Sequence, residues 1–328
     1  MLDVLTIGSA LQDVFIEVSG GQIVNGVGAS NRQKYLGFAP DAKIPVEKLR
    51  RHLGGGGINT AVVFSKLELK AMPVINIGDD SWGEGIIKRL QERDIDTTLV
   101  TREADVPTGL SLVLHDVGEG EHLSFNYKGA SDNLELVNTK LPAAKWLYVS
   151  GLTGDNWRDD IHVVAEMASE MPVAWNPGSI QIRSIGDLDE MLSNTEVLLV
   201  NKEEAAEILR QEGLTPVDDM RLVLRSLAEL GPRHVIVTDG VKGANLFSEG
   251  MWYQAPIVHF DSIDATGAGD TFGATFVAGL MMEKDLKESL AMALVNSGAV
   301  TRAFGAQQGL MTRDEIERRI SEVEVTEL

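Results

Sequence analysis

Short apolar runs alternate with longer amphipathic segments along most of the chain. Runs of β-branched and aliphatic residues that end in Gly, Asn, Asp or Ser predict buried strands, and apolar residues repeating every three or four positions predict helices. The expected strands are Val4–Ile7, Val74–Ile77, Trp146–Val149, Val173–Trp175, Val197–Val200 and Val235–Thr238, and the expected helices are Thr60–Leu69, Trp82–Arg93, Ile161–Ser169 and Glu203–Arg210. This order predicts an α/β fold with a mostly parallel sheet covered by helices on both faces. Ligands of such sheets bind at the carboxyl ends of the strands.

Two stretches depart from this rhythm, at about residues 13–38 and 107–133. Apolar and polar positions alternate there, as in antiparallel strands with one buried face. We interpret them as a small β lid over the sheet edge; the alternative is two surface hairpins without a shared role. The end of the chain, Arg313–Leu328, predicts a charged amphipathic helix.

Composition narrows the classes of function. The 328 residues include 29 basic and 49 acidic side chains, a net charge of −20, and no Cys. The length predicts one large domain over residues 1–328. The absence of Cys excludes disulfides, Cys-ligated zinc and iron–sulfur clusters, and the acidity disfavours nucleic acids and anionic membranes as partners. The uncharged run Gly273–Met282 is too short to span a bilayer. The first residues show no signal-peptide pattern, so a cytoplasmic location is expected.

The strongest candidate for chemistry is the segment Asp264–Gly273, which reads Asp-Ala-Thr-Gly-Ala-Gly-Asp-Thr-Phe-Gly. Gly267, Ala268 and Gly269 can turn tightly and present backbone N–H groups at the start of a helix, which suits a phosphate. Asp270 would repel that phosphate unless it accepts a proton from a hydroxyl that attacks it. The alternative is a glycine turn with an ordinary acidic residue in the first helical turn.

This segment resembles the second signature of the ribokinase-like, or PfkB, family of sugar and nucleoside kinases. Four more segments resemble family motifs in the same order, namely Gly8–Asp13, Leu53–Ala61, Asn201–Glu204 and Thr238–Gly243. The match covers roughly residues 3–315. The resemblance implies a ribokinase-like three-layer sandwich with a small β lid. It also implies ATP-dependent transfer of the γ-phosphoryl group to a hydroxyl, with Mg²⁺.

The resemblance implies a role for each matching residue. Asp270 would be the general base, with Gly267, Ala268 and Gly269 as the anion hole. The substrate would be bound by Asp13, Gly55, Gly57 and Asn59, and the nucleotide by Asn201, Glu204, Thr238, Gly240, Gly243 and Asn296. Glu204 would position Mg²⁺ through water, and Asp264 and Thr266 would begin a site for a monovalent cation such as K⁺. The residues alone also allow plainer roles, because Asn59 and Asn201 can cap helices and Asn296 can be a polar residue on a core helix.

The sequence constrains the identity of the substrate less than it constrains the type of reaction. Gly56 stands where many such sugar kinases have Lys or another residue, and Tyr148–Gly151 lacks the acidic side chain that ribokinases often have there. We rank an unphosphorylated ribose- or fructose-type sugar first, a nucleoside second, and a sugar phosphate or sugar acid third. A catalytically inactive sugar-binding regulator is the non-enzyme alternative.

Other classes fit poorly. The first strand is not followed by Gly-x-Gly-x-x-Gly, as a nicotinamide-dependent oxidoreductase requires, and Gly-Lys-Ser/Thr of Walker-type NTPases is missing. The exposed edges of a β lid predict that the lid pairs with a second copy, as a homodimer.

Overall fold

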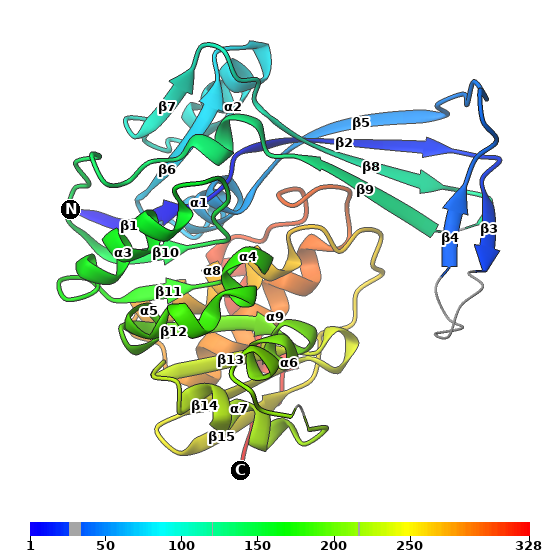
Figure 1. Cartoon of the computed structure of the whole chain (residues 1–328). Helices are drawn as coiled ribbons and strands as arrows, with labels where there is room; N and C mark the ends of the chain where they lie inside the picture. Colours follow the sequence, from blue (N-terminus) through cyan, green and yellow to red (C-terminus); the bar gives the residue numbers. More distant parts are fainter. Residues whose placement is uncertain (26–33, 120, 216) are drawn as a thin grey trace.

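A large twisted sheet forms the centre of the molecule (Figure 1). The computed structural model describes residues 1–25, 34–119, 121–215 and 217–328. Within these ranges the sheet order is β16-β15-β14-β13-β12-β11-β10-β1-β6-β7. The strands are β1 Leu2–Ile7, β6 Ala71–Gly78, β7 Val100–Glu103, β10 Ala144–Val149, β11 Val173–Trp175, β12 Thr195–Asn201, β13 His234–Thr238, β14 Ala244–Ser248, β15 Met251–Ala255 and β16 Thr326–Glu327. Pairing is parallel from β7 to β13 and antiparallel from β13 to β16.

Helices cover both faces of this sheet. They are α1 Gly56–Lys66, α2 Ser81–Gln91, α3 Trp157–Met167, α4 Ser179–Arg183, α5 Asp189–Ser193, α6 Lys202–Gln211, α7 Met220–Ala228, α8 Ala268–Met281, α9 Leu286–Val300 and α10 Arg313–Glu317. One apolar cluster joins α1, α8 and α9 to one face, and a second joins α3, α6 and α7 to the other. Neighbouring residues of β13 alternate between them: Ile236 belongs to the first cluster, and Val235 and Val237 to the second. Burial on both faces explains the continuous apolar strands, and the expected three-layer α/β sandwich is confirmed.

The helices α8 and α9 pack closely against each other and are largely buried. Both helices are apolar around most of their circumference, as expected for helices packed between a sheet and other helices. Gly279 lets them approach closely, because a Cβ there would lie 2.6 Å from Ser289 Oγ. This packing fixes the N-terminus of α8 at the carboxyl end of the sheet.

A second sheet projects from the edge of the first and forms the lid (Figure 1). Its order is β5-β2-β8-β9, with β5 Lys48–Gly54, β2 Leu11–Val18, β8 Gly109–Asp116 and β9 Glu121–Tyr127. The strands β3 Gln22–Asn25 and β4 Lys34–Gly37 pair separately. The expected lid is present, and part of its predicted first segment, residues 26–33, lies outside the described residues. The expected antiparallel arrangement is wrong for β2 and β8, which pair in parallel because both run outward from the main sheet. The strand β5 also belongs to the lid, which the sequence pattern did not indicate.

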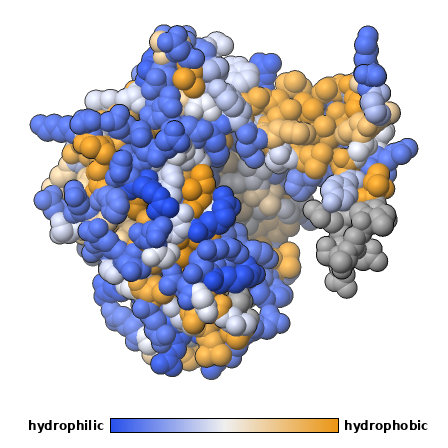
Figure 2. Space-filling model, in the orientation of Figure 1, coloured by the Kyte–Doolittle hydropathy of each residue, from blue (hydrophilic) through white to orange (hydrophobic). Residues whose placement is uncertain are grey.

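The two faces of the lid differ in polarity. Asp13, Phe15 and Glu17 alternate along β2 with Val14, Ile16 and Val18, and the register places polar residues of β5, β8 and β9 beside the first set. The opposite face carries exposed apolar side chains, including Leu49, Phe125 and Tyr127, each half or more exposed. Hydrophobic side chains cover much of the lid surface seen in Figure 2. The polar face turns toward the main domain.

The predicted C-terminal helix Arg313–Leu328 is wrong. The helix α10 ends at Glu317, the 3₁₀ turn η4 covers Ile320–Glu322, and β16 pairs with β15. Val323 is buried in the core beside α9, so tertiary packing overrides the helical pattern. Other boundaries shift by a few residues: α1 and α3 each begin four residues before the expected start. In the part of the chain that the structure describes, no helix is long and apolar enough to cross a membrane.

Two glycines on helices predict opposite effects of the same substitution. A Cβ at Gly273 would lie 2.1 Å from Tyr148 Oη and 2.6 Å from Leu199 Cδ2, inside the packed core. We expect Gly273→Ala to lower the free energy of unfolding by about 1–3 kcal/mol through overpacking. A Cβ at Gly85 would meet nothing within 4 Å, so Gly85→Ala should gain about 0.5–1 kcal/mol from helix propensity. Urea denaturation measures both, and a stable Gly273→Ala variant would contradict the described packing.

Candidate active site

Asp270 lies in the first turn of α8, where the helix meets the carboxyl end of the sheet. The helix begins at Gly267, which has a left-handed φ of 75°. A Cβ at Gly267 would lie 2.3 Å from Ala306 Cβ, so this tight turn requires glycine. Ala268 donates its N–H to the Ala265 carbonyl, whereas a Cβ at Gly269 would meet no atom within 4 Å. The open part of the predicted anion hole is therefore at Gly269.

A chain of hydrogen bonds holds the Asp270 carboxylate. Asn59 Nδ2, on α1, donates to Asp270 Oδ2 at 2.8 Å, and Gln307 Nε2 donates to Asn59 Oδ1 at 3.0 Å. Gln307 also reaches the Leu53 carbonyl at 3.3 Å. Asn59 was predicted to contact the substrate, and here its amide contacts the predicted base, Asp270. The Asn59 residue is only 4% exposed. Gln307 was missed, because a lone Gln in a loop carries no sequence signal.

A second carboxylate shares this site. Asp13 on β2 is 4% exposed, and burial, assisted by the charges of Asp270 and Asp264, raises its pKa to about 7. Burial also raises the pKa of Asp270, against the opposing effect of its hydrogen bond from Asn59. Lys128 lowers the pKa of both carboxyls. The site therefore holds two carboxyls whose charged forms oppose each other.

The glycine run after β5 brings the backbone against both carboxyls. A Cβ at Gly54 would lie 2.1 Å from Asp13 Oδ2, and one at Gly56 would lie 3.5 Å from Asp270 Oδ1. Gly55 has a φ of 96°, and its Cβ would lie 2.4 Å from the Ser9 carbonyl oxygen. Gly57 packs against Gly8, with 3.0 Å from its Cβ position to the Gly8 carbonyl. Gly54 and Gly56 are thus the glycines that lie nearest the two carboxyls. Gly55 and Gly57, which were predicted to contact the substrate, instead form the tight turn and pack against the segment Gly8–Ser9.

Asp264 organises the loop before α8. Its Oδ1 accepts hydrogen bonds from the Thr266 N–H at 3.0 Å and the Thr266 hydroxyl at 2.6 Å, and its Oδ2 accepts from the Gly305 N–H at 2.8 Å. The structure thus brings together the predicted Asp264 and Thr266 with the 300–306 region. The Asp264 carboxylate and the Thr266 hydroxyl are oxygen donors of the kind that a hard cation requires, and a monovalent-ion site here stays a prediction.

A mostly apolar cavity of about 270 Å³ lies beside the start of α8. It is lined by Gly240, Val241, Ile257, Val258, Phe260, Ser262, Ala265, Ala268, Leu294, Ser297, Gly298 and Thr301. Gly240, predicted to bind nucleotide, lies in this lining. Thr238 ends β13, and Gly243 closes the following turn with a φ of 96°.

Asn296 lies in the core near this cavity. It is 1% exposed, donates to Thr275 Oγ1 at 2.9 Å and accepts from the Met311 N–H at 3.0 Å. Its polar groups thus hold α8 and the 310 region together, while the neighbouring Ser297 and Gly298 line the cavity. A nucleotide contact of Asn296 itself stays a prediction.

Asn201 and Glu204 form the N-terminus of α6. Asn201 Oδ1 accepts from the Glu204 N–H at 2.9 Å, and Glu204 Oε2 accepts from the Asn201 N–H at 2.8 Å. This is a capping box, the plainer role open from the sequence. Burial raises the pKa of Glu204. The carboxylate still suits a water-mediated contact to Mg²⁺, because this ion keeps several of its waters.

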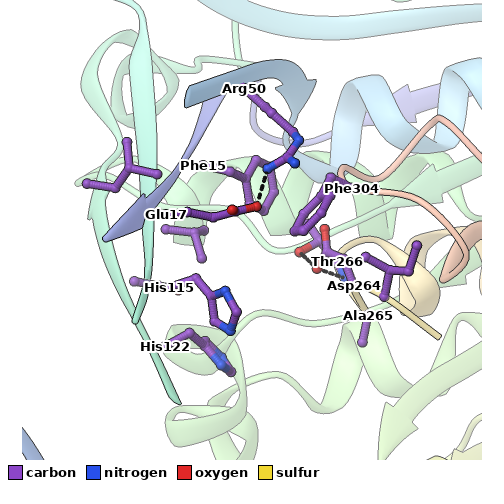
Figure 3. A pocket seen from close by; sticks show the side chains of 13 residues that line it. Phe15, Glu17, Arg50, His115, His122, Asp264, Ala265, Thr266 and Phe304 are labelled. Atoms are coloured by element: carbon purple, nitrogen blue, oxygen red, sulfur yellow. Dashed lines mark hydrogen bonds and ion pairs between the residues drawn. The ribbon is translucent and has the colours of Figure 1, made fainter. Parts of the chain in front are cut away.

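A larger cavity of about 470 Å³ opens between the lid and the main domain (Figure 3). Glu17 on β2 pairs with Arg50 at 2.6 Å, and the Arg50 guanidinium lies 4.2 Å from the centre of the Phe304 ring. His115 and His122 project from paired positions of β8 and β9 into the same space. The sequence did not identify these residues as part of a site, because they belong to no motif. They face the cavity only because of the way the lid strands pair with one another.

Comparison with known proteins identifies the class. The profile described as "pfkB family carbohydrate kinase" matches residues 26–313, and the chain belongs to this family of carbohydrate kinases. The ribokinase of Bacillus subtilis is 24% identical over 273 residues, which cover 82% of this chain and 87% of that protein. The structure of a nucleoside kinase from Methanocaldococcus jannaschii has a TM-score of 0.80 and 21% identity, covering 98% of this chain and 99% of that one. The ribokinase of Arabidopsis thaliana, complexed with ribose and ATP, has a TM-score of 0.76 and 21% identity, covering 98% and 99%.

The raised pKa of Asp13 predicts how stability changes with pH. Its folded pKa of about 7 exceeds the ordinary 3.8, so the folded state binds this proton more tightly than the unfolded state. The free energy of unfolding therefore falls between about pH 4 and pH 7. Asp13→Asn removes the charge, so we expect it to exceed the wild type in unfolding free energy at pH 8 by about 2–4 kcal/mol and to differ little at pH 4.

Asp80→Asn is a control of opposite sign. Against the raising effect of burial, hydrogen bonds from Gly83 and Thr108 hold the pKa of Asp80 below its usual value. This variant should be less stable than the wild type at pH 8. Urea denaturation at the two pH values measures both variants, and an Asp13→Asn protein less stable than wild type at pH 8 would refute the electrostatic argument.

Proposed function

We propose that this kinase transfers the γ-phosphoryl group of ATP to a hydroxyl of a small sugar of the ribose or fructose type. The observation that carries the proposal is Asp270, a desolvated carboxylate in the first turn of α8, held by Asn59 and placed beside Asp13. The proposed catalytic unit combines the main sheet with the lid of β2, β5, β8 and β9.

The proposed reaction uses the two carboxylates differently. Asp13 accepts hydrogen bonds from two substrate hydroxyls, which compensates the burial of its charge. Asp270 takes the proton of the attacking hydroxyl as its oxygen bonds to the γ-phosphorus and the bond to the β-phosphate oxygen breaks, leaving ADP. The raised pKa of Asp270 makes it a stronger base than an exposed aspartate. In this proposal the backbone N–H of Gly269 would face the transferred group, next to Gly267 and to Ala268, whose own N–H donates to the Ala265 carbonyl, with the positive end of the α8 dipole behind them.

Bound cations complete the proposed site. Mg²⁺ would neutralise phosphate charge when bound, and we assign the contact to its waters to Glu204, with Asn201 beside it in the capping box. Asp264 and Thr266 are the proposed ligands of a monovalent cation such as K⁺, next to the anion hole.

The apolar cavity beside Ala268 is the proposed adenine site. Gly240, in the turn between Thr238 and Gly243, lines one side, and α9, which carries Asn296, forms the other. The complex of the Arabidopsis thaliana ribokinase with ribose and ATP supports ATP as the donor in this fold. The apolar lining of the cavity beside Ala268 suits a planar base, and the phosphates of ATP would extend from there toward Gly269.

A nucleoside is the second candidate acceptor. The cavity of about 470 Å³ beside Asp264 exceeds the needs of a sugar alone, and Phe15 and Phe304 offer aromatic rings there. The Methanocaldococcus jannaschii protein of similar fold is a nucleoside kinase. A catalytically inactive sugar-binding regulator is less favoured, because such a protein has no use for the held and desolvated Asp270.

A panel assay decides among these candidates. Purified protein with ATP and Mg²⁺ is offered pentoses, hexoses and nucleosides, and ADP formation is coupled to mass detection of the phosphorylated product. Phosphorylation of a ribose- or fructose-type sugar is expected. Phosphorylation of nucleosides alone would favour the second candidate, and no product from any acceptor would refute the proposed activity.

Asp270→Asn tests the proposed base. The variant should keep its fold and ATP binding and lose about 10²- to 10⁴-fold in kcat, because it cannot take the proton of the acceptor. Asp314→Asn, an exposed acidic residue in the first turn of α10, is the matched control and should retain full activity. Wild-type turnover by Asp270→Asn in the same steady-state assay would exclude the proposed role.

We also propose that two copies form a homodimer through the apolar face of the lid. Exposed Leu49, Phe125 and Tyr127 lie on this face, and a second copy would remove them from water. Phe125→Glu should convert the dimer to a monomer, whereas Val137→Glu, a change at an equally exposed apolar residue outside the lid, should not. Light scattering after size exclusion gives both masses. A monomeric wild type, or a dimeric Phe125→Glu variant, would contradict the proposal.

A further inference from the structure

One buried hydroxyl group close to the active site has no role in the account given above. Tyr148 lies near the carboxyl end of β10, is 1% exposed, and its Oη has no hydrogen-bond partner. Its ring is fixed in the core edge-to-face with Phe64 of α1, at 5.9 Å between ring centres. A buried hydroxyl without a partner costs stability, and a phenylalanine of the same shape would avoid that cost. The hydroxyl of Tyr148 therefore needs an explanation other than packing.

The hydroxyl of Tyr148 is directed at the helix that carries the proposed base. A Cβ at Gly273 would lie 2.1 Å from Tyr148 Oη, so only glycine at this position of α8 leaves room for the hydroxyl. Gly273 follows Asp270 by three residues, and residues with this spacing are neighbours on one face of a helix. The Tyr148 hydroxyl thus approaches α8 from the core, on the face that carries Asp270.

The chain that follows Tyr148 also passes beside the Asp270 carboxyl group. Ser150 comes directly after β10, and the Cβ position of Gly56 lies 2.4 Å from Ser150 Oγ and 3.5 Å from Asp270 Oδ1. The Ser150 hydroxyl already donates to the Ile7 carbonyl at 3.0 Å. Of these two hydroxyl groups, that of Tyr148 is therefore the one whose proton is free to turn toward Asp270.

The charge of Asp270 acts on the Tyr148 hydroxyl. Burial raises the pKa of Tyr148 well above its ordinary value, and the negative charge of Asp270 acts in the same direction. Tyr148 therefore keeps its proton at neutral pH. Hydroxyl dipoles orient in the local field, so the positive end of this O–H bond turns toward the Asp270 carboxylate.

The carboxyl group of Asp270 has few other groups that stabilise its charge. Among the described residues, its one hydrogen-bond donor is the Asn59 amide, which reaches Oδ2. Lys128 lowers the pKa of Asp270 by its positive charge, whereas the Asp13 carboxyl group shares the site as a like charge. Tyr148 adds a neutral donor from the core, where a further positive charge would be costly to bury.

We propose that Tyr148 is a positioning residue for Asp270, and that its O–H dipole, directed from the core at the carboxylate, keeps the base ionised. This role rests on the proposed function, in which Asp270 accepts the proton of the attacking hydroxyl. Burial makes Asp270 a stronger base but also favours its protonated form. A neutral donor on the core side of the carboxylate offsets the second effect without covering the side that meets the acceptor.

Tyr148→Phe tests the proposal, because it removes the hydroxyl and leaves the ring. The acid limb of the profile of kcat against pH should move to higher pH by about half a unit or more, since the ionised form of Asp270 loses a stabilising dipole. At a pH on this limb kcat should fall by about threefold or more, with little change on the plateau. Tyr253→Phe makes the same change at a part-buried tyrosine of β15 and should leave the profile unmoved.

Two results of this assay would overturn the proposal. One is a Tyr148→Phe profile that coincides with that of the wild type. The other is a fall in kcat by the same factor at every pH, which would indicate that the hydroxyl supports packing and not the ionisation of Asp270.

A ¹³C NMR titration of the Asp270 carboxyl group tests the same interaction without turnover. The pKa of Asp270 should be higher in Tyr148→Phe than in the wild type, and Asp270→Asn identifies the resonance. An equal or lower pKa in Tyr148→Phe would refute the dipole. A protein without turnover on any acceptor would refute the proposed kinase function, and the NMR result would still decide whether Tyr148 acts on Asp270.

Discussion

The candidate site is built around two buried carboxyl groups, those of Asp13 and Asp270, placed so that the charge of Asp270 opposes that of Asp13. One comes from the lid and the other from the first turn of α8, so neither element can position the pair alone. Burial disfavours the charge of each, and the charge of Asp270 disfavours that of Asp13 further. Such an arrangement costs stability in the free protein and persists only because the surrounding fold holds it. Substrate hydroxyls, which donate hydrogen bonds, are the partners that would relieve it.

Much of the surrounding structure can be understood as support for this pair. The glycine run after β5 has no side chains to keep the backbone away from Asp13 and Asp270. Asn59 gives Asp270 a neutral donor, and Gln307 in turn fixes the orientation of the Asn59 amide. The left-handed turn at Gly267 directs the N-terminus of α8 at the same space. The net charge of −20 is compatible with the proposed phosphate site, because backbone N–H groups and cations, and not a basic surface, would supply the positive potential there.

The sequence predicted features that depend on local chemistry. Apolar strands ending in polar residues, the helix starting at the Gly267 turn and the position of Asp270 all follow from patterns of a few residues. Features set by distant contacts could not be predicted in this way. The strand β5 joins the lid only through pairing with β2, and the predicted C-terminal helix is cut short because Val323 packs in the core. Gln307 is identified only when Asn59 is placed beside it, and the family resemblance did not indicate that Asn296 would use its amide within the core.

A ¹³C NMR titration of the aspartate carboxyl groups tests the interaction between Asp13 and Asp270 most directly. The Asp13 carboxyl of the free protein should titrate at about pH 7, and Asp270→Asn should lower that value, because it removes the largest like charge. Asp13→Asn assigns the resonance. Titration of Asp13 near the ordinary value of 3.8, or a value unchanged by Asp270→Asn, would show that the two carboxylates do not share one desolvated site.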